Sequence, residues 1–63
     1  GIKRDYVAAR RHYLEAADND LAGGFLGLGY LYEFGLGVQI DLVKAQAFYD
    51  LGTQASGSAL NEN

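Results

Sequence analysis

The sequence predicts an all-α fold, a fragment of an α-solenoid in which antiparallel helical hairpins stack side by side. Two observations favour this fold class. Apolar residues recur at helical spacing in three stretches of the chain, and the first stretch is repeated 36 residues later. The 63 residues therefore correspond to about one and a half repeat units, a first unit over residues 1–36 and an incomplete second unit over residues 37–63.

The first helix is expected over about residues 5–18. One stripe of this segment carries the apolar residues Tyr6, Ala9, Tyr13, Ala16 and Ala17. Asp5 stands directly before the stripe, where its carboxylate accepts hydrogen bonds from free backbone N–H groups and favours the positive end of the helix. The polar run over residues 18–20 then ends the helix.

The second helix is expected over about residues 21–34, which are apolar nearly all round the helix. A strand over residues 28–34 is the competing interpretation, but the whole run is longer than a typical strand of about five or six residues. Glycines at positions 23, 24, 27 and 29 each cost about 0.8–1 kcal/mol relative to alanine. We therefore expect this helix to be packed tightly between neighbours on two sides. Gly35 and Gly37 end it, because glycine adopts left-handed backbone angles readily.

The third helix is expected over about residues 41–54, with Asp41 as its N-cap. Its apolar positions are Leu42, Ala45, Phe48 and Tyr49. The pattern weakens after Gly52, and Ser56-Gly57-Ser58 is typical of a turn. The last residues would then form only the stub of a fourth helix.

The internal repeat places identical residues where a turn, a helix cap or a core is needed. A shift of 36 residues superimposes Gly1 on Gly37, Asp5 on Asp41, Val7 on Val43, Ala9 on Ala45 and Tyr13 on Tyr49. One hairpin cannot bury its own apolar faces, so copies are expected to stack. Small residues let the helices approach to about 8–10 Å. The seam between them is expected to be filled by Tyr13, Leu28, Tyr32 and Tyr49.

A longer pattern links these positions. It consists of Ala9, His12-Tyr13, Ala16-Ala17, Gly24, Leu28-Gly29, Tyr32, Gly35, Gly37-Val38 and Asp41. This pattern resembles the Sel-one-like repeat (SLR) family, which is related to the tetratricopeptide repeats, and the resemblance covers residues 1–50. The chain departs from the family pattern at Asp20, where a turn glycine is expected, and at Gly24, where an alanine is expected. In the second copy it departs at Gly52-Thr53 and Ser56.

The resemblance implies a scaffold for protein–protein contacts whose concave face is lined by the first helix of each unit. The stripe opposite the core on the first helix centres on Arg11. This stripe and its counterparts on the third helix are the expected partner-binding residues: Arg10, Arg11, Leu14, Glu15, Gln46, Ala47, Asp50 and Leu51. Arg11 and Glu15 are also spaced for an i,i+4 ion pair, as on a solvated helix face.

Within the family, residues 27–32 and 37–39 are similar to the eukaryotic adaptor of ER-associated degradation, a lumenal protein that partners a membrane ubiquitin ligase and receives misfolded glycoproteins. The sequence therefore favours an adaptor segment, in the ER lumen if this similarity holds and otherwise in the cytoplasm. The alternative is a regulatory repeat region attached to an enzyme, as in the chitin-synthase activators or the elongation-factor kinase. Neighbouring SLR units are further expected partners, since the chain lacks Met and is expected to be a piece of a longer protein.

Composition argues against other classes of function. The net charge is −3, with +3 over residues 1–11 and −6 over the rest, so nucleic acid is not an expected partner. Without Cys there is no disulfide or thiolate site, and no metal-ligand spacing occurs. The longest uncharged run, residues 21–32, is shorter than the ~20 residues that a membrane span needs.

No enzyme constellation is present either, and no cofactor is expected. His12 has no nucleophile or metal-ligand companions at a recognised spacing, and is expected to be a partly buried packing residue. Residues 24–29 spell GxxGxG, which is the wrong order for a phosphate loop, and they are better explained by helix–helix contact.

Overall fold

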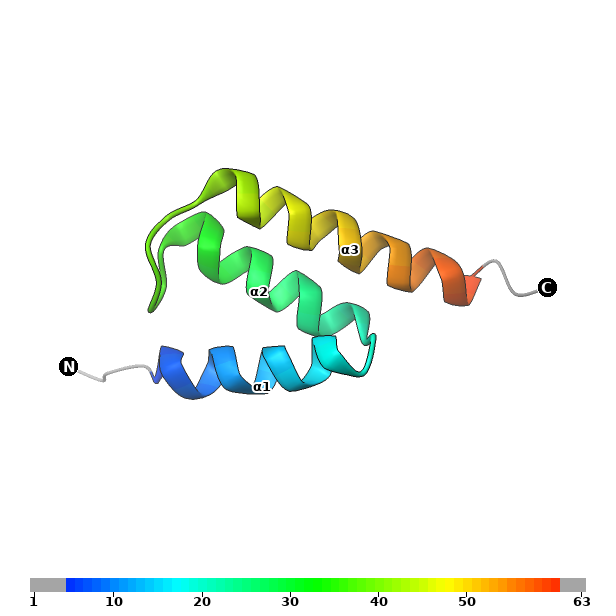
Figure 1. The fold of residues 1–63 in the computed structure, drawn as a ribbon, viewed down its shortest axis with the longest axis horizontal. Coiled ribbons are helices and arrows are strands. Elements are labelled where there is room, and N and C mark those ends of the chain that lie inside the picture. Colours follow the sequence, from blue (N-terminus) through cyan, green and yellow to red (C-terminus); the bar gives the residue numbers. More distant parts are fainter. Residues whose placement is uncertain (1–4, 61–63) are drawn as a thin grey trace.

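The computed structural model describes residues 5–60, and this part of the chain is all-α (Figure 1). Helix α1 spans Tyr6–Asp18, α2 spans Ala22–Phe34 and α3 spans Leu42–Leu60. Helix α2 runs antiparallel to both of the others and lies between them (Figure 1). The prediction of consecutive antiparallel hairpins is therefore confirmed, as is the prediction that the second helix packs on two sides.

Both predicted aspartate caps are present. Asp5 Oδ1 accepts a hydrogen bond from the Ala8 N–H at 3.0 Å, and Asp41 Oδ1 accepts one from the Lys44 N–H at 3.0 Å. Each bond satisfies one of the backbone donors that the first turn of a helix leaves free. The sequence therefore located the start of α1 and of α3 correctly.

The connections use left-handed backbone at three positions. Gly35 ends α2 with φ 65° and Gly37 follows with φ 75°, as predicted from the two glycines. The third position is Asp20, with φ 60°, between α1 and α2. The family pattern has glycine there, and aspartate is one of the few other residues that tolerate this conformation.

The prediction of a turn at Ser56-Gly57-Ser58 was wrong. Helix α3 continues through these residues to Leu60, so it does not end near residue 54. Gly57 does not adopt a positive φ, unlike Gly35 and Gly37. A single glycine lowers helix stability by about 1 kcal/mol but does not by itself end a helix, so the composition of this segment was misleading.

The core is centred on α2. Leu28 and Leu31 of α2 and Ala45 of α3 are 1%, 2% and 2% exposed, respectively. Among the predicted seam residues only Leu28 is fully buried, whereas Tyr13, Tyr32 and Tyr49 are half-buried. The seam is completed by Phe48, whose ring stacks on that of Tyr32 with 5.7 Å between centroids and 21° between planes.

Three of the four α2 glycines lie where a larger residue would collide with a neighbouring helix. A Cβ added to Gly24 would lie 2.7 Å from the Ala16 Cβ of α1. One added to Gly27 would lie 2.5 Å from the Tyr13 ring, and one added to Gly29 would lie 2.7 Å from the Tyr49 ring of α3. Gly23 differs, since a Cβ there would meet nothing within 4 Å. The close approach inferred from sequence thus holds at three positions.

Candidate partner-binding surface

The predicted partner-binding residues of α1 are all exposed. Arg10, Arg11, Leu14 and Glu15 lie away from α2, and the Leu14 side chain, 47% exposed, stands among the charged residues. This mixture of an accessible apolar side chain with cations and an anion suits contact with another protein, in which apolar area supplies affinity and charge supplies specificity.

Two details on α1 correct the sequence predictions. His12 is not partly buried, because its side chain is 76% exposed. Its Nδ1 lies 4.0 Å from Glu15 Oε1. No Lys or Arg side chain in residues 5–60 lies within 4.0 Å of a carboxylate, so the expected Arg11–Glu15 pair does not form. His12 is exposed because no helix within residues 5–60 covers its side of α1, whereas Phe48, its repeat equivalent on α3, stacks on α2.

The predicted residues of α3 are exposed as well. Gln46 Nε2 donates a hydrogen bond to Asp50 Oδ1 at 3.0 Å along the helix surface. Ala47 and Leu51 flank this pair, and Leu51 is 42% exposed. Because α2 lies between α1 and α3, the two predicted stripes are on separate helices that do not pack on each other. The structure does not join them into one patch.

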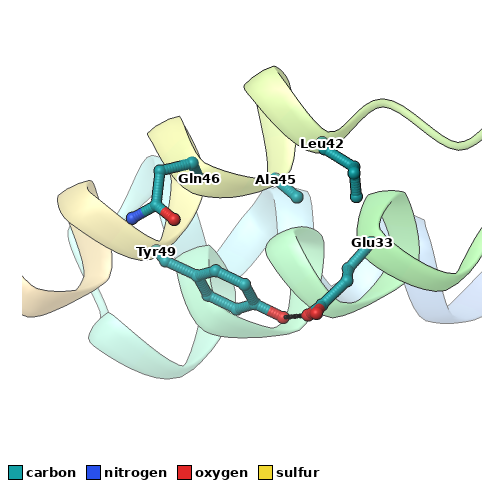
Figure 2. Close-up of a pocket in the computed structure, with 5 residues that line it drawn as sticks. All are labelled: Glu33, Leu42, Ala45, Gln46 and Tyr49. Atoms are coloured by element: carbon teal, nitrogen blue, oxygen red, sulfur yellow. Dashed lines mark hydrogen bonds between the residues drawn. The ribbon is translucent and has the colours of Figure 1, made fainter.

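A groove that the sequence did not predict lies between the end of α2 and the first half of α3. It has a volume of about 230 Å³ and is lined by Glu33, Leu42, Ala45, Gln46 and Tyr49 (Figure 2). Only Gln46 belongs to the predicted partner-binding set. The remaining residues come from two helices, and no spacing within one helix could have indicated that they meet.

A short hydrogen bond closes one side of this groove. Tyr49 Oη donates to Glu33 Oε1 at 2.5 Å, and the two side chains point toward each other from facing helices (Figure 2). The bond to Glu33, together with burial and the negative charge of the carboxylate, raises the pKa of Tyr49 to about 12. Glu33 therefore makes a tertiary contact that joins α2 to α3.

The described residues contain neither a metal-ion cluster nor a membrane-spanning helix. In residues 5–60 no three His, Cys, Asp or Glu side chains are grouped so that they could hold a metal ion. Over the same part of the chain, no helix has both the length and the apolar character to cross a membrane.

Comparison with known proteins identifies relatives along almost the whole chain. The Sel1 repeat family model matches residues 1–21 and 25–55. Protein sel-1 homolog 2 of Mus musculus is 42% identical over 60 residues, and the human protein of the same name is 40% identical over 60 residues. The ERAD-associated E3 ubiquitin-protein ligase component HRD3A of Arabidopsis thaliana is 36% identical over 59 residues.

Each of these matches covers 94% of this chain but only 9% of the relative, so the chain spans about a tenth of their length. No solved structure matches the chain. The second family match begins within α2 and continues through the glycine connection into α3. Its boundaries therefore differ from those of the units predicted at residues 1–36 and 37–63. The matched residues, the helical hairpins and the 36-residue internal repeat agree, and the chain belongs to the Sel1 repeat family.

Proposed function

We propose that this chain is an interaction segment of an adaptor protein, in which Sel1 repeats stack to present a surface to protein partners. The observation that carries the proposal is the exposed stripe on α1, where Leu14 stands among Arg10, Arg11 and Glu15 without any covering element of the described chain. A protein whose role was to bind a small molecule would instead be expected to enclose a pocket of about 300–1,000 Å³.

The finer proposal is that the adaptor serves a ubiquitin-ligase complex of ER-associated degradation, with neighbouring repeats of the same protein as additional contacts. The name of the Arabidopsis relative describes a component of such a ligase, which supports this proposal. In this proposal the segment contributes a contact surface to the complex.

Affinity capture of the full-length protein, followed by mass spectrometry, tests both levels of the proposal. We expect ubiquitin-ligase subunits in the wild-type sample and their loss with Leu14→Asp or Arg11→Glu. Leu21→Asp is the matched control, since Leu21 is 56% exposed but lies outside the stripe, in the α1–α2 connection. Capture of a kinase or a chitin synthase would support the regulatory alternative. Equal capture by all variants would show that the α1 stripe is not the binding surface.

A further inference from the structure

One face of α1 remains uncovered when another helix packs beside it. Val7 and Leu14 are 61% and 47% exposed, and because they are seven residues apart they lie about two turns apart on the same side of the helix. Two exposed arginines lie between them in the sequence. The α1 face, as defined here, consists of Val7, Arg10, Arg11 and Leu14.

The internal repeat shows that stacking of helices leaves this face free. On α1 the face is seen with the following helix, α2, packed beside it, and on α3 the equivalent face is seen with the preceding helix, α2, packed beside it. The equivalent residues of α3 are also exposed, and they are Val43, Gln46, Ala47 and Asp50. Neighbours on either flank of such a helix therefore do not occupy the face, and it is open to a separate partner.

The charge of the α1 face is not needed for the fold. The repeat positions of Arg10 and Arg11 on α3 hold Gln46 and Ala47, which carry no charge and occupy the same place in a helical hairpin. Neither arginine lies within 4.0 Å of a carboxylate in residues 5–60. The remaining cation of α3, Lys44, lies over the Tyr32 ring at 4.9 Å. The two guanidinium groups thus retain their capacity to bind acceptors, in a chain whose net charge is −3.

We propose that the α1 face binds an acidic amphipathic helix of a partner protein. Val7 and Leu14 would contact apolar side chains of that helix, and Arg10 and Arg11 would bind its carboxylates through charge-assisted hydrogen bonds. A partner helix with apolar residues seven positions apart and two carboxylates between them matches the spacing of the face. The inference rests on the proposed function and adds the chemistry of the partner to it.

Fluorescence anisotropy with two labelled peptides tests this selectivity on the full-length protein. One probe is a capped alanine–glutamine helix with two leucines seven positions apart and two adjacent glutamates midway between them. The matched probe has lysines in place of the glutamates. We expect the glutamate probe to bind about tenfold more tightly at low ionic strength. This preference should fall in about 1 M salt, because exposed ion pairs are screened.

Substitutions on α1 should change the preference in a defined way. The double variant with Arg10→Gln and Arg11→Gln should lose it. The double variant with Arg10→Glu and Arg11→Glu should reverse it, and tighter binding of the lysine probe would also show that the variant is folded. Lys44→Gln is the matched control, since it removes one cation from α3 and should retain the preference.

The proposal is overturned if the wild type binds both probes equally, if the glutamine variant keeps the preference, or if charge reversal does not favour the lysine probe. It is also overturned if Lys44→Gln loses the preference as fully as the α1 variants do. These results are separable from the capture experiment. Loss of ligase capture with Leu14→Asp, together with equal binding of the probes, would reject the acidic partner and retain the proposed function. Equal capture by all variants, together with the glutamate preference, would reject the proposed function alone.

Discussion

Gly23 and Gly24, which are adjacent at the start of α2, allow the close packing of α1 on α2 to be tested by a pair of alanine substitutions. A Cβ added to Gly23 would meet no atom within 4 Å, whereas one added to Gly24 would lie 2.7 Å from both the Ala16 Cβ and the Tyr13 carbonyl oxygen. The second contact is with backbone, which cannot rotate away as a flexible side chain can. Gly24→Ala therefore forces α1 away from α2, and Gly23→Ala changes only the helix itself.

The expected effects have opposite signs. Gly23→Ala should raise the free energy of unfolding by about 0.5–1 kcal/mol, because alanine is the better helix former and nothing opposes its side chain. Gly24→Ala gains a similar helix propensity but pays an overpacking cost of about 1–3 kcal/mol. Both variants gain the same helix propensity. The difference between their free energies of unfolding therefore measures the overpacking cost alone. For a domain of this size, about 1 kcal/mol corresponds to about 4–8 °C in melting temperature.

Urea denaturation and thermal melting, followed by far-UV circular dichroism, measure both quantities. Gly24→Ala should melt at least about 4 °C below Gly23→Ala, with a lower urea midpoint and an unchanged m-value. Equal stability of the two variants, with neither below the wild type, would refute the close packing of α2 on α1. A drop for Gly23→Ala as large as that for Gly24→Ala would mean that a covering element lies where the structure shows open space.

Three further predictions concern α3. Gly57→Ala should stabilise the chain by up to about 1 kcal/mol, because Gly57 lies within the helix with no atom near its added Cβ, and thermal melting measures this gain. Asp41→Ala should cost about 1 kcal/mol in urea denaturation, because the Lys44 N–H loses its acceptor. Tyr49→Phe should weaken the fall in melting temperature at alkaline pH. The pKa of Tyr49 is raised from 10.0 to about 12. The contribution of the Tyr49 hydroxyl to the free energy of unfolding is therefore complete below pH 10 and is lost as the pH rises toward 12.

Each of these predictions has a contrary outcome. Destabilisation by Gly57→Ala would support the turn at Ser56-Gly57-Ser58 that sequence composition predicted, and would contradict the continuation of α3 through these residues. An Asp41→Ala variant as stable as the wild type would mean that water replaces the cap fully. Identical alkaline melting profiles for the wild type and Tyr49→Phe would show that the bond to Glu33 does not persist in solution.

The elements that follow local rules could be predicted from the sequence. Asp5 and Asp41 mark helix starts, and Gly35 marks a helix end, because a cap or a left-handed turn depends on neighbouring backbone alone. The end of α3 could not be predicted in this way. The same residue type, glycine, ends α2 at position 35 and continues a helix at position 57, and local composition does not distinguish the two.

In the candidate site, too, features set by local sequence could be predicted, and features set by contacts between helices could not. Helical spacing correctly identified Arg11, Leu14 and Asp50 as surface residues. The apolar stripe of each helix marks the face that packs, so the residues on the opposite face are exposed. The prediction that His12 is partly buried was wrong, because burial at this position depends on whether another helix packs on that side of α1. The Glu33–Tyr49 bond joins residues 16 positions apart on facing helices, so its existence depends on the register between α2 and α3.

The position of α2 between two neighbours has a consequence for how the chain loses its structure. Its glycines make it a poor helix in isolation, and its N-cap residue, Leu21, offers no side-chain acceptor. Detachment of either flanking helix would therefore remove the contacts that α2 requires, and all three should melt as one cooperative unit. Hydrogen exchange should then show α2 amides opening only with the whole molecule, while the outer ends of α1 and α3 fray at lower energy.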